Sequence, residues 1–81
     1  MVDWIGEAAQ ALGIGPMTDQ EVQVVLDLAR DVSHGTGDRR QAPLSAFLAG
    51  VAAASAAPRE EGLRAAYETI LTLLPAAEGL G

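Results

Sequence analysis

The segment Thr18–Ser33, TDQEVQVVLDLARDVS, decides the fold of this 81-residue chain. Thr18 followed three residues later by Glu21 is the pattern of a capping box, which begins a helix. Apolar residues then recur at helical spacing over residues 19–33 and cover about half of the circumference. Val22, Val25, Leu26, Ala29 and Val32 form this face, and Val24 and Leu28 widen it. We expect this helix to be the central element of the fold.

A second helix is predicted over residues 43–57. It follows residues 35–41, a stretch with two glycines and several charges that is typical of a loop. Pro43 suits the first position of a helix, and Pro58 cannot continue one. Four large apolar residues fall at i, i+3, i+4 and i+7, the spacing of a buried face. They are Leu44, Phe47, Leu48 and Val51, and we expect them in the core.

One further helix is predicted on each side of this pair. Asp3 can cap a helix over residues 4–12, and Gly13 supplies the left-handed residue that stops it. The last helix is predicted over residues 59–74. Its apolar face consists of Leu63, Ala66, Tyr67, Ile70 and Leu74.

These elements predict an all-α protein, because no segment shows the period-two alternation of a strand. We expect a compact up-and-down bundle of four short helices, with orthogonal packing as the alternative, in a single domain over residues 1–81. Residues 76–81 should fray. Trp4 and Tyr67 are expected as core residues with a polar tip near water.

Composition excludes several classes of function. The formal net charge is −6 and no basic stripe follows any predicted helix, so nucleic-acid binding is not expected. There is no cysteine and only one histidine, so neither a metal site nor a cofactor is predicted. No apolar run is long enough to span a bilayer and no signal sequence begins the chain, so a cytoplasmic location is expected.

The helix over residues 43–57 has a second unusual face, because it carries no charge and is rich in alanine on the side opposite its large apolar residues. Alanine there has a simple explanation as a good helix former. The alternative is that small residues let a second helix approach closely, as in a homodimer or at a docking face. The residues concerned are Ala46, Ala49, Gly50, Ala53 and Ala57.

One polar cluster could recognise a ligand or a partner, and it consists of Asp31, His34, Arg39 and Arg40. The two arginines precede a helix N-terminus, where free N–H groups and the helix dipole favour an anion. The alternative is purely structural, with His34 at the carbonyl end of its helix and Asp31 paired with an arginine. No nucleophile or second metal ligand accompanies His34, so an enzyme is not expected.

Two segments resemble a known family: Leu26–Gly35, LDLARDVSHG, and Arg39–Gly50, RRQAPLSAFLAG, with Asp3-Trp4 and Leu12-Gly13 before them. The chain is similar in them to a small uncharacterised helical domain of actinobacteria. Members of that family occur alone or attached to the molybdenum cofactor guanylyltransferase, which adds GMP to molybdopterin. The resemblance implies a helix–loop–helix corner in which Leu44, Phe47 and Leu48 fill the core.

No activity is implied by the resemblance. It suggests a non-catalytic accessory module that binds a protein partner, such as the guanylyltransferase, or a second copy of itself. The alternative is a small-molecule binding protein for an anionic ligand, such as a phosphorylated pterin or a nucleotide, held at Arg39 and Arg40.

Overall fold

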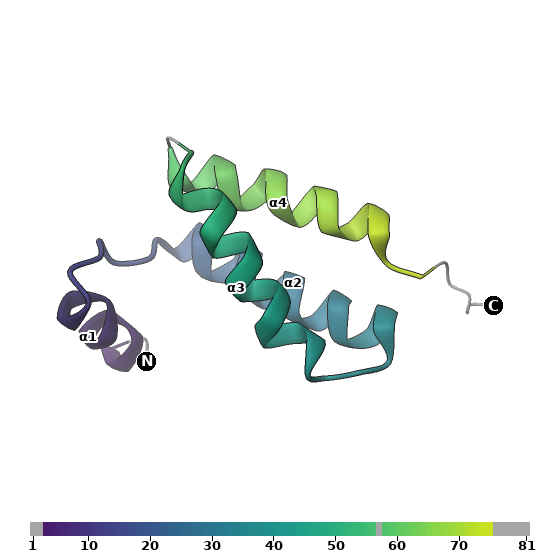
Figure 1. Cartoon of the computed structure of the whole chain (residues 1–81). Helices are drawn as coiled ribbons and strands as arrows, with labels where there is room; N and C mark the ends of the chain where they lie inside the picture. Colours follow the sequence, from purple (N-terminus) through teal and green to yellow (C-terminus); the bar gives the residue numbers. More distant parts are fainter. Residues whose placement is uncertain (1–2, 57, 76–81) are drawn as a thin grey trace.

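The computed structural model describes residues 3–56 and 58–75, which form four α-helices (Figure 1). They are α1 (Asp3–Ala11), α2 (Asp19–Thr36), α3 (Gln41–Ala54) and α4 (Arg59–Leu73). The described ranges contain no strand, so the prediction of an all-α chain with four short helices is confirmed. Ala57, predicted as the last residue of the third helix, and the tail 76–81 lie outside the described residues.

Three of the four helices form the packed body. α2, α3 and α4 each pack against the other two, whereas α1 makes no comparable contact with any of them within the described ranges. In Figure 1, α3 leads from the end of α2 to the start of α4, and α1 lies to one side, near the N-terminal end of α2. The bundle is therefore built from three helices, with α1 beside it.

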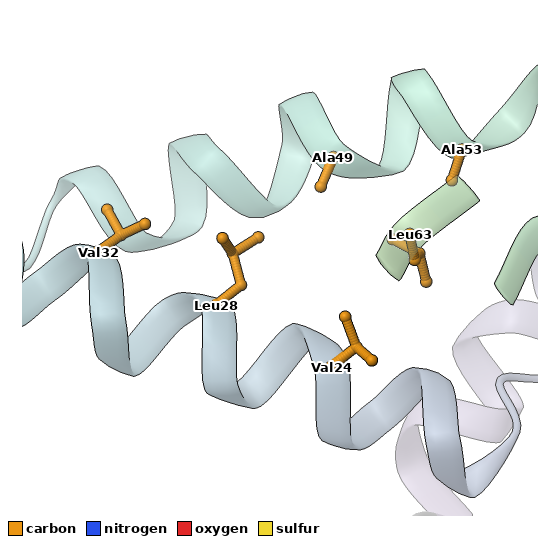
Figure 2. Close-up of a cluster of buried hydrophobic side chains, with 6 residues drawn as sticks. All are labelled: Val24, Leu28, Val32, Ala49, Ala53 and Leu63. Carbon is orange, nitrogen blue, oxygen red and sulfur yellow. The ribbon is translucent and has the colours of Figure 1, made fainter. Parts of the chain in front are cut away.

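The core is small and comes from all three packed helices (Figure 2). The side chains that lie fully inside it are Val24, Leu28 and Val32 of α2, Ala49 and Ala53 of α3, and Leu63 of α4. The predicted face of α4 is confirmed, since Ala66, Tyr67, Ile70 and Leu74 pack against this cluster beside Leu63. On α2 the centre of the buried face differs from the prediction, because Leu26 points outward and is exposed.

The prediction for α3 was wrong about which face is buried. Ala49 and Ala53 are each only 1% exposed, whereas Phe47 is 69% and Leu48 62% exposed. Leu44 and Val51 are exposed as well, so the whole predicted core face points outward. A stripe of large residues and a stripe of alanines on the opposite side have the same 3.6-residue period, so periodicity alone cannot choose between them. Close helix packing favours the small residues.

The position of Gly62 shows how closely α3 and α4 approach. A Cβ at this residue would lie 2.6 Å from Cβ of Ala56 and 3.0 Å from Cα of Ala53. Small residues therefore do let a second helix approach α3, as the sequence suggested, but that helix is α4 of the same chain. Ala49 and Ala53 are consequently not available as a face for a second copy. Ala46 is half-buried and Gly50 is exposed.

α2 is longer than predicted, because its left-handed cap is Gly37 rather than an earlier residue. The Thr36 hydroxyl donates to the Val32 carbonyl at 2.7 Å, which gives this carbonyl near the end of the helix a hydrogen-bond donor. Gly35 therefore lies inside the helix, where a Cβ would stand 3.0 Å from Cδ1 of Leu74. The absence of a side chain at Gly35 allows the end of α4 to pack here.

The end of α1 follows the prediction. Gly13 has φ +73° and its N–H donates to the carbonyl of Gln10, while the N–H of Ile14 donates to that of Ala9 at 2.9 Å. These two bonds make a Schellman motif, which needs a left-handed residue at its centre. Trp4, by contrast, is 73% exposed, so its predicted place in the core is wrong.

Two glycine-to-alanine substitutions test this packing against each other. Gly62→Ala should lower the free energy of unfolding by about 1–3 kcal/mol, because the added methyl group overlaps α3. Gly50→Ala should raise it by up to about 1 kcal/mol, since nothing lies within 4 Å of a Cβ there and alanine is the better helix former. Urea denaturation measures both values. Equal effects of the two substitutions would contradict the proposed contact of α3 with α4.

Candidate functional site

The most buried charged group is Glu21, in the first turn of α2, which is 2% exposed. The predicted capping box is present: Oε1 of Glu21 accepts from the N–H of Thr18 at 2.8 Å, and the N–H of Glu21 donates to Oγ1 of Thr18 at 3.0 Å. The same carboxylate also accepts two bonds from Arg59, from Nε at 2.7 Å and from Nη2 at 2.7 Å. The carboxylate is thus engaged through both oxygens.

Arg59 joins three parts of the chain. Besides Glu21, its guanidinium donates to the carbonyls of Gly15 and Pro16, at 3.3 and 3.1 Å. It therefore ties the first residue of α4 to the start of α2 and to the segment that leads from α1. The hydrogen bonds from Arg59 hold the pKa of Glu21 below its usual range, although burial alone would raise that pKa. A carboxylate fixed in this way is suited to structure rather than to proton transfer.

Sequence analysis missed this ion pair, because the two residues are 38 positions apart. One signal could have indicated it. A cation in the first turn of a helix faces the positive end of the helix dipole, which is unfavourable without a partner. Arg59 begins α4, so its position alone calls for a nearby carboxylate.

The structure does not bring the four residues of the predicted polar cluster into one site. Asp31 accepts a 2.6 Å hydrogen bond from the hydroxyl of Tyr67 on α4 and a 3.2 Å bond from Nε of Arg30. The expected pairing of Asp31 with an arginine is therefore confirmed, although Arg30 was not singled out. His34 is exposed on the last turn of α2. The cluster thus contributes Asp31 to the contact between α2 and α4.

The hydrogen bond between Tyr67 and Asp31 changes the pKa of both side chains. It is the main reason that the pKa of Asp31 lies below its usual range, and also the main reason that the pKa of Tyr67 lies above its own. Tyr67 packs against the core as predicted and is partly buried, and its hydroxyl is hydrogen-bonded to Asp31. What the sequence did not indicate is that Asp31 provides the acceptor.

The N-terminus of α3, proposed above as an anion site, already holds an internal carboxylate. Asp38 accepts from the backbone N–H of Arg40 at 3.0 Å and from Nε and Nη2 of its side chain at 3.2 Å each. The next two N–H groups, of Gln41 and Ala42, donate to the carbonyls of Asp38 and Arg39, and Pro43 has no N–H. The backbone donors at this helix end and the side chain of Arg40 are therefore in use, which leaves the exposed Arg39 as the remaining cation of the proposed anion site. The anion hypothesis gains no support from this geometry.

Other kinds of site are not apparent in the described ranges. Residues 3–56 and 58–75 contain no group of three histidine, cysteine, aspartate or glutamate side chains that could hold a metal ion. None of the helices described there combines the length and the apolar character needed to cross a bilayer.

The largest unexplained feature is the outward side of α3, which we call the α3 apolar face and define as Leu44, Phe47, Leu48 and Val51. A groove of about 500 Å³ lies beside it, lined by Phe47, Gly50 and Val51 and by Ile14 and Met17 of the segment before α2. A second groove of about 460 Å³ lies between α3 and α4, and Leu48 and Ala52 line it on the α3 side. Both grooves are lined almost entirely by apolar side chains, and α3 carries no charged residue.

These features define a class: a small all-α domain whose buried carboxylate is paired internally and in which α3 exposes an apolar face. The chain belongs to the family described as a domain of unknown function, DUF6457, which matches residues 1–79. No curated protein and no solved structure matches the chain.

The ion pair gives a testable dependence of stability on pH. Glu21→Gln should lower the free energy of unfolding at neutral pH by about 2 kcal/mol, because Arg59 loses a charged partner. Since the folded pKa of Glu21 lies below the unfolded value of about 4.3, its contribution is fully present above that pH and is lost as the pH falls further. Glu21→Gln should therefore lose less stability than the wild type on acidification.

Denaturant titrations at neutral and acid pH measure this difference. Glu61→Gln, which removes an exposed carboxylate from the first turn of α4, is the matched control and should cost about 0.5 kcal/mol or less. Parallel acid sensitivity of Glu21→Gln and the wild type would be incompatible with this role of the pair.

Tyr67 is the only tyrosine, so its titration can be followed by phenolate absorbance without interference. We expect a pKa above the usual value of about 10, and a return toward that value in Asp31→Asn. Because the folded pKa is raised, the stabilising contribution is present below pH ~10 and is lost as the pH rises through the folded pKa. Asp38→Asn serves as the control. If Asp31→Asn left the titration unchanged, the bond between the two side chains would be refuted.

Proposed function

We propose that this protein is a non-catalytic interaction module that binds protein through the α3 apolar face. The observation that carries the proposal is the reversed orientation of α3. The four side chains of the face are among the largest apolar groups in the chain, yet each is more than half exposed. Burying one such side chain is worth about 1.5–3 kcal/mol, so a chain that leaves four of them together in water gains much from a partner.

The chemistry of the face specifies the kind of partner. It has no charged group and few polar atoms along 14 residues of helix, and a groove runs along each side of it. An amphipathic helix that lays its apolar side into such a groove is a common mode of recognition. Three carboxylates of the domain, by contrast, are paired within it: Glu21 with Arg59, Asp31 with Tyr67, and Asp38 with Arg40.

The resemblance of Leu26–Gly35 and Arg39–Gly50 to the actinobacterial domain supplies a candidate partner. Because members of that family also occur attached to the molybdenum cofactor guanylyltransferase, we propose that this chain works beside that enzyme in the cytoplasm, as an accessory to molybdenum cofactor maturation. The anionic-ligand alternative has less support, since Asp38 occupies the N-terminus of α3.

Binding to purified guanylyltransferase tests the proposed function. The wild-type chain should bind, Phe47→Asp should lose most of the affinity because it places a charge in the apolar face, and Leu26→Asp should bind as the wild type does. Leu26 is a suitable control because it is a comparably exposed leucine on α2, turned away from the buried Val24 and Leu28.

Isothermal titration calorimetry or biolayer interferometry provides the affinities. Absence of binding by the wild type would remove the guanylyltransferase as the partner. Equal affinities of the three chains would show that the α3 apolar face is not the docking surface.

A further inference from the structure

α1 presents a second apolar surface, and none of the other described helices packs closely against it. Its apolar residues Trp4, Ile5 and Ala8 lie on one side of the helix, and Leu12 in the terminal turn continues that side. Gln10 lies on the opposite side, and Glu7 lies beside Trp4, at the edge of the polar side. Trp4 is 73% and Leu12 72% exposed. Short isolated helices are marginal in water and depend on packing for their stability. α1 has nine residues and buries little, so it gains little stability from packing.

The two apolar surfaces match in chemistry and in size. The apolar side of α1 and the α3 apolar face both lack charged residues, so joining them buries no ion. At 1.5 Å per residue, α1 is about 14 Å and α3 about 21 Å long, so α1 fits along α3. The polar side of α1, with Glu7, would stay in solvent.

We infer that α1 of a second copy of this chain occupies the α3 apolar face, in a two-fold symmetric dimer in which each copy gives its α1 to the other. The inference rests on the proposed function, since it takes the α3 apolar face to be a docking surface, and it names the occupant. The contact is reciprocal, so a closed dimer forms without leaving either surface free.

The arrangement within one chain favours a second copy over the chain's own α1. α1 lies beside the bundle in Figure 1 and makes no comparable contact with α3, although it is joined to the segment that lines the groove. Ile14 and Met17 of that segment already stand at the edge of the groove.

The area that reciprocal exchange covers is sufficient for a specific dimer. Each copy contributes eight large apolar side chains that are at least 40% exposed: Trp4, Ile5, Leu12 and Ile14, and the four of the α3 apolar face. At on the order of 100 Å² for each side chain, two copies bury on the order of 1,600 Å², which is the size of a standard specific interface.

The full chain provides its own probe, because Trp4 is the only tryptophan. Sedimentation should show a monomer–dimer equilibrium, and the emission of Trp4 should move to shorter wavelength as the concentration rises. Trp4→Asp and Phe47→Asp should each be monomeric, and Leu26→Asp should dimerise as the wild type does. Circular dichroism checks that each variant remains helical, which is expected because all three sites are exposed.

Mixing the two monomeric variants gives the sharpest test. Phe47→Asp keeps Trp4, and Trp4→Asp keeps an intact α3 apolar face, so together they restore one of the two contacts. Adding Trp4→Asp chain to Phe47→Asp chain should therefore shift the tryptophan emission to shorter wavelength, whereas adding more Phe47→Asp chain should not.

Three outcomes would overturn the inference. A monomer at every concentration with unchanging emission shows that α1 does not exchange. Short-wavelength emission that does not depend on concentration places α1 on its own chain. A dimer that survives both substitutions uses another surface. A wild-type monomer that still binds the guanylyltransferase through Phe47 would remove this inference and leave the proposed function standing. Dimerisation without enzyme binding would remove the guanylyltransferase as the partner and leave a second copy as the occupant of the α3 apolar face.

Discussion

The close approach of α3 to its two neighbours is the constraint on which the rest of the structure depends. Ala49 and Ala53 lie at the centre of the core, and Gly62 of α4 leaves no room for a side chain against α3. Because the helices approach closely, many backbone and Cβ atoms are in contact, so dense packing is reached without large side chains. The consequence is that α3 turns its four largest residues outward.

The polar groups fix this arrangement at the ends of the helices. Arg59 holds the start of α4 against the start of α2 through Glu21, and Tyr67 holds the later part of α4 against α2 through Asp31. Both bonds join α2 to α4, so the spacing of the two helices against which α3 packs is set independently of α3. Of the groups that the sequence offered for recognition, Asp31 and Arg40 are thereby paired inside the domain, whereas His34 and Arg39 are exposed. The largest exposed apolar side chains of α3 form the α3 apolar face.

Local signals in the sequence predicted the elements well. The capping box at Thr18 and Glu21 and the left-handed glycine at Gly13 have the expected geometry, and the helix bounds differ from the predictions by at most three residues. These features depend on residues that are close together in the chain, so the spacing of residues in the sequence predicts them. The orientation of α3 depends instead on the distance between helices, which no spacing reveals. The same holds for Arg59 and Tyr67, whose partners are 38 and 36 residues away.

The orientation of α3 can be tested by one comparison of urea denaturation, made at high dilution with Phe47→Asp and Ala49→Asp. Phe47→Asp should change the free energy of unfolding by only about 0.5 kcal/mol, because the side chain is exposed. Ala49→Asp should cost at least ~3 kcal/mol or unfold the domain, because it places a charge in the core. A domain that unfolds with Phe47→Asp and keeps its stability with Ala49→Asp would contradict the account.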